Sequence, residues 1–189
     1  MSSLPTEHPP PVPGGALFQI LDSVLEPKSC AYVAGPLDSG KAYYERVASG
    51  DHTPAVRAEN ESRLNAFVLN LRQRLKYPVF DSGLLKVSGW SGRDYSTFFL
   101  EVIRRYAKEC WFMNGWEYST GATKEFVFCC TIQTPCLVES GERLIARDGV
   151  RLIHEAADFV RGLGLNDTKL RWRAEDLNRL EGASADRRR

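Results

Sequence analysis

Short apolar runs alternate with longer amphipathic stretches along the chain from residue 16 onward. The runs are β-prone and end at glycine, proline or polar residues, as buried strands often do. They cover residues 29–35, 77–81, 110–114 and 134–139. Strands that alternate with helices predict an α/β domain with a parallel sheet of about four or five strands, flanked by helices.

The amphipathic stretches predict helices. The clearest one covers residues 55–76, where charged positions lie opposite an apolar stripe of Leu64, Phe67, Val68, Leu71 and Leu75. Other predicted helices cover 93–109, 120–133 and 149–164, and residues 16–25 are expected to form a short helix or a packing arm. We expect a helix cap at Ser119 or Thr120 and a helix end at Gly162 or Gly164. Residues 37–54 are predicted to be a long polar loop, or a loop with a short helix, and residues 82–92 a glycine-marked loop.

The length of 189 residues suits one domain that buries roughly two-thirds of its unfolded surface. Residues 1–15 are rich in proline and are predicted to be disordered or extended. We therefore expect a single Rossmann-like domain over residues 16–164, followed by a basic C-terminal tail over residues 165–189.

Composition and charge narrow the choice of partners. The net charge is +1, which favours neither a nucleic-acid partner nor an anionic membrane surface. The five cysteines form no CxxC motif and mostly lie in apolar stretches, which predicts free thiols in a reducing compartment. No apolar run approaches the length of a membrane span, and we expect a cytoplasmic protein.

The segment NGWEYSTGATKEF at residues 114–126 holds the residues best suited to chemistry. A helix that begins near Ser119 and Thr120 directs its first amides and its positive dipole end at the preceding loop, which favours an anion. Gly121 allows a ligand to approach the backbone, and Glu125 lies among residues expected to face the core. The alternative interpretation is that Ser119 only caps the helix and that Glu125 faces solvent beside a basic residue.

Three motifs occur in order along the chain. They are Ala-Gly-Pro at 34–36, Arg-Asp at 93–94 and Gly-Trp-x-x-Ser-x-Gly-x-x-x-Glu at 115–125. Over residues 30 to 140 this pattern resembles the nucleoside 2-deoxyribosyltransferase-like superfamily, including its branch of nucleoside 5′-monophosphate N-glycosidases and CMP hydrolases. The resemblance implies an enzyme without a cofactor or metal that works as a homodimer. It also implies a small-molecule nucleotide as the ligand.

The resemblance assigns roles to individual residues. It implies that Glu125 attacks or stabilises the anomeric carbon, that Asp94 handles the proton of the base, and that Ser119 favours a 5′-phosphate. The loop after the first strand contacts substrate in that family, which adds the substrate-binding predictions Tyr32, Gly35, Pro36, Ser39 and Lys41 to Thr120 and Gly121. Trp116 could stack on a base or sugar, or could simply wedge the turn.

The expected reaction is hydrolysis of the N-glycosidic bond of a nucleoside 5′-monophosphate. Cleavage builds positive charge on the sugar ring, which a carboxylate can stabilise or trap, and the departing base needs a proton. Alternatives are base exchange by a deoxyribosyltransferase and a non-catalytic nucleotide-binding or sensor module. Cleavage of a dinucleotide such as NAD is a further possibility, and it would require room beyond the phosphate near Ser119.

Overall fold

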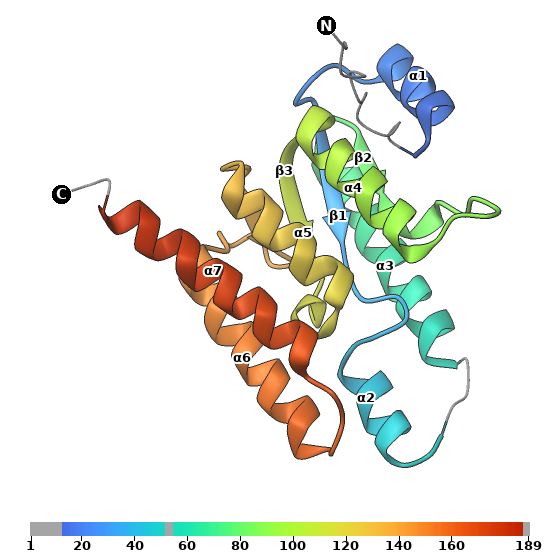
Figure 1. Ribbon diagram of the computed structural model, residues 1–189. Coiled ribbons are helices and arrows are strands. Elements are labelled where there is room, and N and C mark those ends of the chain that lie inside the picture. Colours follow the sequence, from blue (N-terminus) through green and yellow to red (C-terminus); the bar gives the residue numbers. More distant parts are fainter. Residues whose placement is uncertain (1–12, 52–54, 187–189) are drawn as a thin grey trace, which may run out of the picture.

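The computed structural model describes residues 13–51 and 55–186 and contains a four-stranded parallel sheet (Figure 1). The strand order is β2-β1-β3-β4. The strands are β1 (Cys30–Ala34), β2 (Val79–Asp81), β3 (Ala107–Phe112) and β4 (Cys136–Val138). The predicted α/β fold with a Rossmann-like parallel sheet is therefore confirmed.

Helices connect and flank these strands. They are α1 (Gly15–Val24), α2 (Lys41–Ala48), α3 (Ala55–Arg74), α4 (Gly92–Tyr106), α5 (Thr120–Thr131), α6 (Ala146–Gly162) and α7 (Thr168–Asp186), with short 3-10 turns η1 (Ser82–Leu84) and η2 (Trp116–Tyr118). Residues 1–12, most of the predicted N-terminal segment, lie outside the described residues. The predicted segment 37–54 contains the short helix α2.

The sheet has a hydrophobic core on each face, and the central strand β1 contributes side chains to both. Its five residues are all buried and alternate between the faces of the sheet, as the period of a strand requires. Ala31 and Val33 pack in the core beneath α3. Cys30, Tyr32 and Ala34 belong to the larger core, which α4, α5, α6 and α7 complete on the opposite face.

Two element boundaries differ from the sequence prediction by three residues, and the others by two at most. Strand β3 begins at Ala107, within the predicted helix 93–109, because Ala107 pairs with Cys30 at the start of β1. Pairing and full burial of Ala107 override the local helical pattern there. Helix α6 begins at Ala146, three residues before the predicted start at residue 149.

The predicted basic tail is wrong for the larger part of residues 165–189, because residues 168–186 form α7. Leu170, Ala174 and Leu177 share a helical stripe and are buried in the larger core. In Figure 1, α7 runs beside α6 along the outer side of the domain. The basic residues are partly paired, since Arg171 binds both Asp158 and Asp167. The apolar stripe, rather than the positive charge, determines the structure of this segment.

The order of the strands determines where a ligand can bind. The chain passes from β1 to β2 on one side and then returns to β3 on the other side of β1. In open parallel sheets, ligands bind beyond the carboxyl ends of the strands at such a reversal. Residues 35–40 after β1 and 113–119 after β3 lie at that point, where Gly115 adopts a positive φ of 92° that suits glycine.

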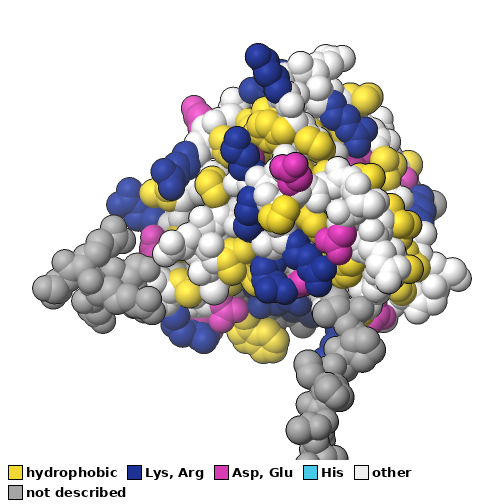
Figure 2. Space-filling model, turned by 90° about the horizontal axis from the view of Figure 1, so that it is seen from above, with side chains coloured by type: hydrophobic (Ala, Val, Ile, Leu, Met, Phe, Trp, Pro, Cys, Tyr) yellow, Lys and Arg dark blue, Asp and Glu magenta, His cyan; other side chains and the backbone are white. Residues whose placement is uncertain are grey.

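The face seen from above carries scattered charges. Figure 2 shows lysine and arginine side chains distributed over it, with acidic side chains between them. None of the helices in the described part of the chain combines the length and apolar character that crossing a bilayer requires.

The contact between α5 and α6 gives a stability prediction. A β-carbon placed on Gly149 would lie 2.0 Å from Cε1 of Phe126, which is buried in the core. Gly149→Ala should therefore lower the free energy of unfolding by about 1–3 kcal/mol, as overpacking does. Gly162→Ala in the same helix is the control, because no atom lies within 4 Å of its added carbon. Urea unfolding measures both, and equal stability of the two variants would contradict the close packing at Gly149.

Candidate active site

A buried tyrosine–glutamate pair joins β1 to α5. Ser119 caps α5, since its Oγ accepts a hydrogen bond of 3.3 Å from the amide of Ala122. Glu125 lies in the second turn and is only 9% exposed. Its Oε1 accepts a hydrogen bond of 3.0 Å from the hydroxyl of Tyr32, which points from β1 into the same core. The predicted inward orientation of Glu125 is thus confirmed, and the solvent-facing alternative is wrong.

The environment of Glu125 alters its acidity. Burial disfavours the charged form and raises the pKa of Glu125 to about 8, while the Tyr32 hydrogen bond and the positive charge of Lys124 act in the opposite direction. The pKa of Tyr32 is raised well above its usual value, first by burial and then by the neighbouring carboxyl group. At neutral pH Glu125 is therefore largely protonated, and small changes in its surroundings change its charge.

Glu125 lines a cavity of about 340 Å³, which we name the Glu125 cavity. Four elements form its wall: the loop after β1, the turn after β2, the first turns of α4 and the N-terminus of α5. The wall consists of Gly35, Leu37, Asp38, Ser39, Ser82, Gly92, Tyr95, Ser96, Phe99, Ser119, Thr120, Gly121, Ala122 and Glu125. The volume falls at the small end of the range for ligand pockets, roughly 300–1,000 Å³.

The start of α5 gives one side of this cavity an anion-binding character. Ser119, Thr120 and Gly121 all line it. The first amides of a helix have no intrahelical acceptor, and the positive end of the helix dipole adds to their attraction for an anion. A β-carbon on Gly121 would contact only Ser119 Oγ, at 3.7 Å, so the space beside this backbone is open. The cavity therefore combines a buried carboxyl group with donors suited to a phosphate.

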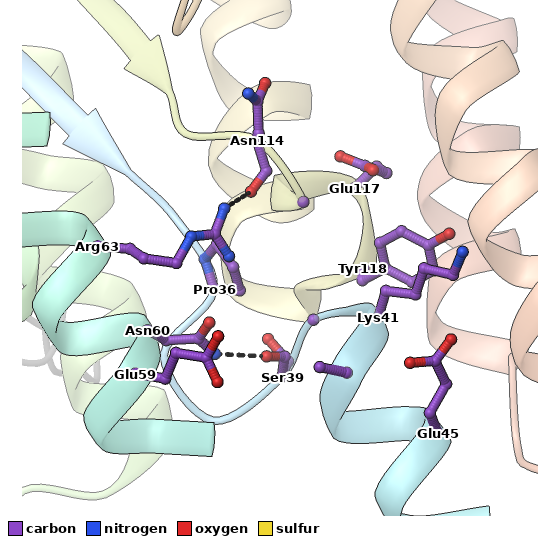
Figure 3. Close-up of a pocket in the computed structure, with 13 residues that line it drawn as sticks. Pro36, Ser39, Lys41, Glu45, Glu59, Asn60, Arg63, Asn114, Glu117 and Tyr118 are labelled. Atoms are coloured by element: carbon purple, nitrogen blue, oxygen red, sulfur yellow. Dashed lines mark hydrogen bonds between the residues drawn. The ribbon is translucent and has the colours of Figure 1, made fainter. Parts of the chain in front are cut away.

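Helix α3 holds the loops that surround the site. Asn60 is buried and donates hydrogen bonds to the carbonyl oxygens of Leu37 and Ser39, at 3.0 and 2.8 Å. Arg63 donates to the carbonyl of Asn114, at 3.2 Å (Figure 3). Both loops at the carboxyl edge are thus attached to one helix, which orients them before any ligand binds.

The residues predicted from the first-strand loop separate into two groups. Gly35 lines the Glu125 cavity, whereas Pro36 and Lys41 line a second cavity of about 470 Å³ beside Arg63. Ser39 lines both. Figure 3 shows this second cavity, with Lys41 extending past Tyr118 from the first turn of α2. Its ammonium group lies 5.0 Å from the ring centroid of Phe159, so it is directed toward α6 and not toward Glu125.

Like Tyr32, Pro36 and Lys41, the predicted residues Asp94 and Trp116 do not line the Glu125 cavity. Asp94 forms a capping box at the start of α4, where its carboxylate accepts hydrogen bonds from the amide and hydroxyl of Ser91. The Ser91 hydroxyl and amide bonds lower the pKa of Asp94, which makes its carboxyl group a weak proton donor at neutral pH. Trp116 is buried between Phe112 and Phe126, so it wedges the turn after β3 rather than stacking on a ligand.

Several residues of the cavity wall were not predicted. Asp38 is one of them, and its carboxylate accepts hydrogen bonds of 2.6 Å from Arg57. Ser82 directly follows β2, and its position after a strand was a usable signal. Tyr95, Ser96 and Phe99 come from the inner side of α4, and the helical pattern alone does not distinguish them from core residues.

Comparison of the chain with protein-family models, curated proteins and solved structures found no match. The resemblance to the deoxyribosyltransferase-like superfamily therefore remains a prediction from the motifs. In the described part of the chain, no three histidine, cysteine, aspartate or glutamate side chains are grouped to hold a metal ion. Of the three histidines, His8 and His52 lie outside the described residues.

The buried carboxyl group predicts a pH-dependent stability. Since the folded-state pKa of Glu125, about 8, exceeds the ordinary value of 4.5, the folded protein holds this proton more tightly than the unfolded chain does. Its contribution to stability is complete below pH 4.5 and is lost as the pH rises through 8. Between pH 5 and pH 9, the free energy of unfolding of Glu125→Gln should therefore fall less than that of the wild type. The two decreases should differ by about 1–4 kcal/mol. Urea unfolding at both pH values measures this difference, and parallel pH dependences would contradict a buried ionisable group at position 125.

Proposed function

We propose that the protein hydrolyses the N-glycosidic bond of a nucleoside 5′-monophosphate and releases a free base and a sugar 5-phosphate. One observation carries this proposal: a buried carboxyl group, Glu125, lines a cavity whose wall also contains the N-terminus of α5. A nucleotide presents the matching groups, namely a sugar whose anomeric carbon becomes positive during cleavage and a phosphate. The sequence motifs support the same assignment.

In this proposal Glu125 acts at the sugar. Its ionised form stabilises the positive charge that develops as the bond between the anomeric carbon and the base nitrogen breaks, or forms a covalent bond with that carbon. Water then supplies a hydroxyl group to the carbon, and a proton goes to the base. Tyr32 supports the ionised form by donating its hydrogen bond to Oε1.

The phosphate would bind at the start of α5. The hydroxyl of Ser119 and the amides of Thr120 and Gly121 supply donors without a nearby negative charge on that turn. The proton of the departing base needs a source other than Asp94, whose carboxylate is bound by Ser91 and does not line the cavity.

The homodimer expected from the resemblance belongs to the same proposal. Helix α1 exposes Ile20 and Val24, at 59% and 67%, which are apolar side chains available for a contact between copies. Base exchange and nucleotide binding without turnover would use the same cavity. Incubation of a deoxynucleoside with a second free base distinguishes exchange from hydrolysis, because only exchange yields a new nucleoside.

The role of Glu125 predicts a loss of activity in a conservative variant. Glu125→Gln keeps the size of the side chain but removes its charge, and should lower base release from nucleoside monophosphates by roughly 100-fold or more. Glu109→Gln is the matched control, since Glu109 also accepts a tyrosine hydrogen bond, from Tyr77, on the other face of the sheet. Chromatography of the released base measures both variants. Full activity in Glu125→Gln would refute the proposed mechanism.

The raised pKa predicts the pH profile. Because the ionised carboxylate of Glu125 is the active form, kcat/KM should rise with pH and level off above about pH 8. Tyr32→Phe removes a hydrogen bond that lowers the pKa of Glu125, so the inflection should move to higher pH. Tyr77→Phe, which loses the hydroxyl bound to Glu109, should leave the inflection in place. A profile that instead falls through pH 8 would make the protonated form of Glu125 the active one.

A further inference from the structure

A third cavity adjoins the Glu125 cavity at the α5 N-terminus. It has a volume of about 510 Å³, and we name it the Trp172 cavity. Its wall includes Tyr43, Tyr44, Thr120, Lys169 and Trp172. The two cavities share three lining residues, Asp38, Ser39 and Thr120. They therefore meet at the loop after β1 and the first residue of α5, where the proposed phosphate would lie.

Helices α2 and α7 form most of the wall of this cavity. Tyr43 and Tyr44 come from α2, and Lys169 and Trp172 come from the first turns of α7. Leu170, between them, is buried in the core and attaches this end of α7 to the domain. The wall is therefore anchored to the folded domain.

The side chains of the wall suit a flat aromatic group. Trp172 is 58% exposed and Tyr43 is 37% exposed, although large aromatic side chains usually bury most of their surface. Tyr43 and Tyr44 pack edge to face, with centroids 5.4 Å apart. Exposed aromatic rings around a cavity are a stacking platform for a nucleobase, since every base presents a π face.

The charges near the junction suit a phosphate chain. Lys169 lines the Trp172 cavity and forms no ion pair with any residue in ranges 13–51 and 55–186. The nearby carboxylates are occupied, because Asp38 is bound by Arg57 and Asp167 by Arg171. The N-terminus of α5, at Thr120, adds its positive dipole end at the junction.

We infer that the substrate extends beyond its 5′-phosphate and is a dinucleotide, in which a pyrophosphate links two nucleosides. This inference rests on the proposed function. One nucleoside occupies the Glu125 cavity, the pyrophosphate lies along Thr120 and Lys169, and the second base stacks against Trp172 and Tyr43. The Glu125 cavity alone, at about 340 Å³, is too small for both halves of such a ligand.

The reaction balances with water as the only co-reactant. The bond between the anomeric carbon and the base in the Glu125 cavity breaks with its electron pair on the base, and water adds a hydroxyl group to the carbon. The remaining proton goes to a base that departs as an anion, such as adenine, and to solvent when the base departs as a neutral molecule, such as nicotinamide. The pyrophosphate and the second nucleoside stay intact on the sugar product. The second base contributes binding energy alone and takes no part in the chemistry.

Binding measurements on two matched ligand pairs test the inference. The pairs are nicotinamide mononucleotide with NAD, and AMP with diadenosine diphosphate. Titration calorimetry on the full chain carrying Glu125→Gln keeps each ligand intact during the measurement. The same titrations are repeated after adding Trp172→Ala, Trp172→Phe or Leu69→Ala. Leu69 is the matched control, because it is an apolar residue of similar exposure, 57%, on α3.

For at least one pair, the dinucleotide should bind at least about tenfold more tightly than the mononucleotide. A gain of this size lies in the lower part of the range that stacking of one base contributes to affinity. Trp172→Ala should remove this gain and leave the affinity for the mononucleotide unchanged. Trp172→Phe should retain most of the gain because it keeps a ring, and Leu69→Ala should retain all of it. Circular dichroism verifies that each variant is folded.

Three results would overturn the inference: equal affinity for both members of each pair, equal weakening of both members by Trp172→Ala, or no binding of any of the four ligands. Base release from the unmutated protein separates the two proposals. If mononucleotides are bound and hydrolysed and the second nucleoside adds no affinity, the extended substrate is refuted and the proposed hydrolase stands. Dinucleotides that bind through Trp172 but release no base after long incubation would refute the hydrolase and leave the subsite.

Discussion

The pairing of β1 on both of its edges is the constraint on which the rest of the structure depends. The strand lies between β2 and β3, and all five of its residues are buried. Its alternating side chains enter two different cores, so each of them has a defined face. The parallel neighbours also bring their carboxyl ends to one edge. The loops that surround the site begin there.

The Tyr32–Glu125 hydrogen bond follows from this constraint. Because Tyr32 points into the core beneath α5, its hydroxyl meets a carboxyl group that would otherwise lack a donor. Burial of Glu125 opposes its ionisation and raises its pKa. The folded protein is therefore less stable at high pH, where this group must ionise. Desolvation of this kind is a common property of functional sites. The buried carboxyl group thus lowers the stability of the fold at high pH.

Helix α7 follows the last strand of the sheet and the last helix beside it, and it packs on the same face of the domain. Its apolar stripe completes the larger core, while its first turns form part of the Trp172 cavity. One helix thereby contributes to both packing and the surroundings of the site. Helix α3 has a comparable double role on the opposite face, where Asn60 holds the loop after β1 and neighbouring apolar residues cover the sheet.

The local elements were largely predictable because they depend on residues close together in the chain. The helix predicted over 55–76, the strand predicted over 29–35 and the cap expected at Ser119 or Thr120 agree with the structure to within two residues. Periodicity and capping involve neighbours within about one or two turns, and a sequence displays such neighbours directly. The direction of Glu125 was not decided in this way, because apolar neighbours on its helix left a solvent-facing position open, and the structure shows it buried against Tyr32.

By itself, therefore, the sequence determined the alternation of strands and helices and the start of α5. Tertiary structure decided which groups meet. The bond between Tyr32 and Glu125 joins residues 93 positions apart, and the direction of Lys41 depends on the ring of Phe159. Asp94 stays outside the cavity because its own cap, at Ser91, satisfies its carboxylate. Contacts across the sheet and between distant helices follow from chain packing, which local periodicity does not encode.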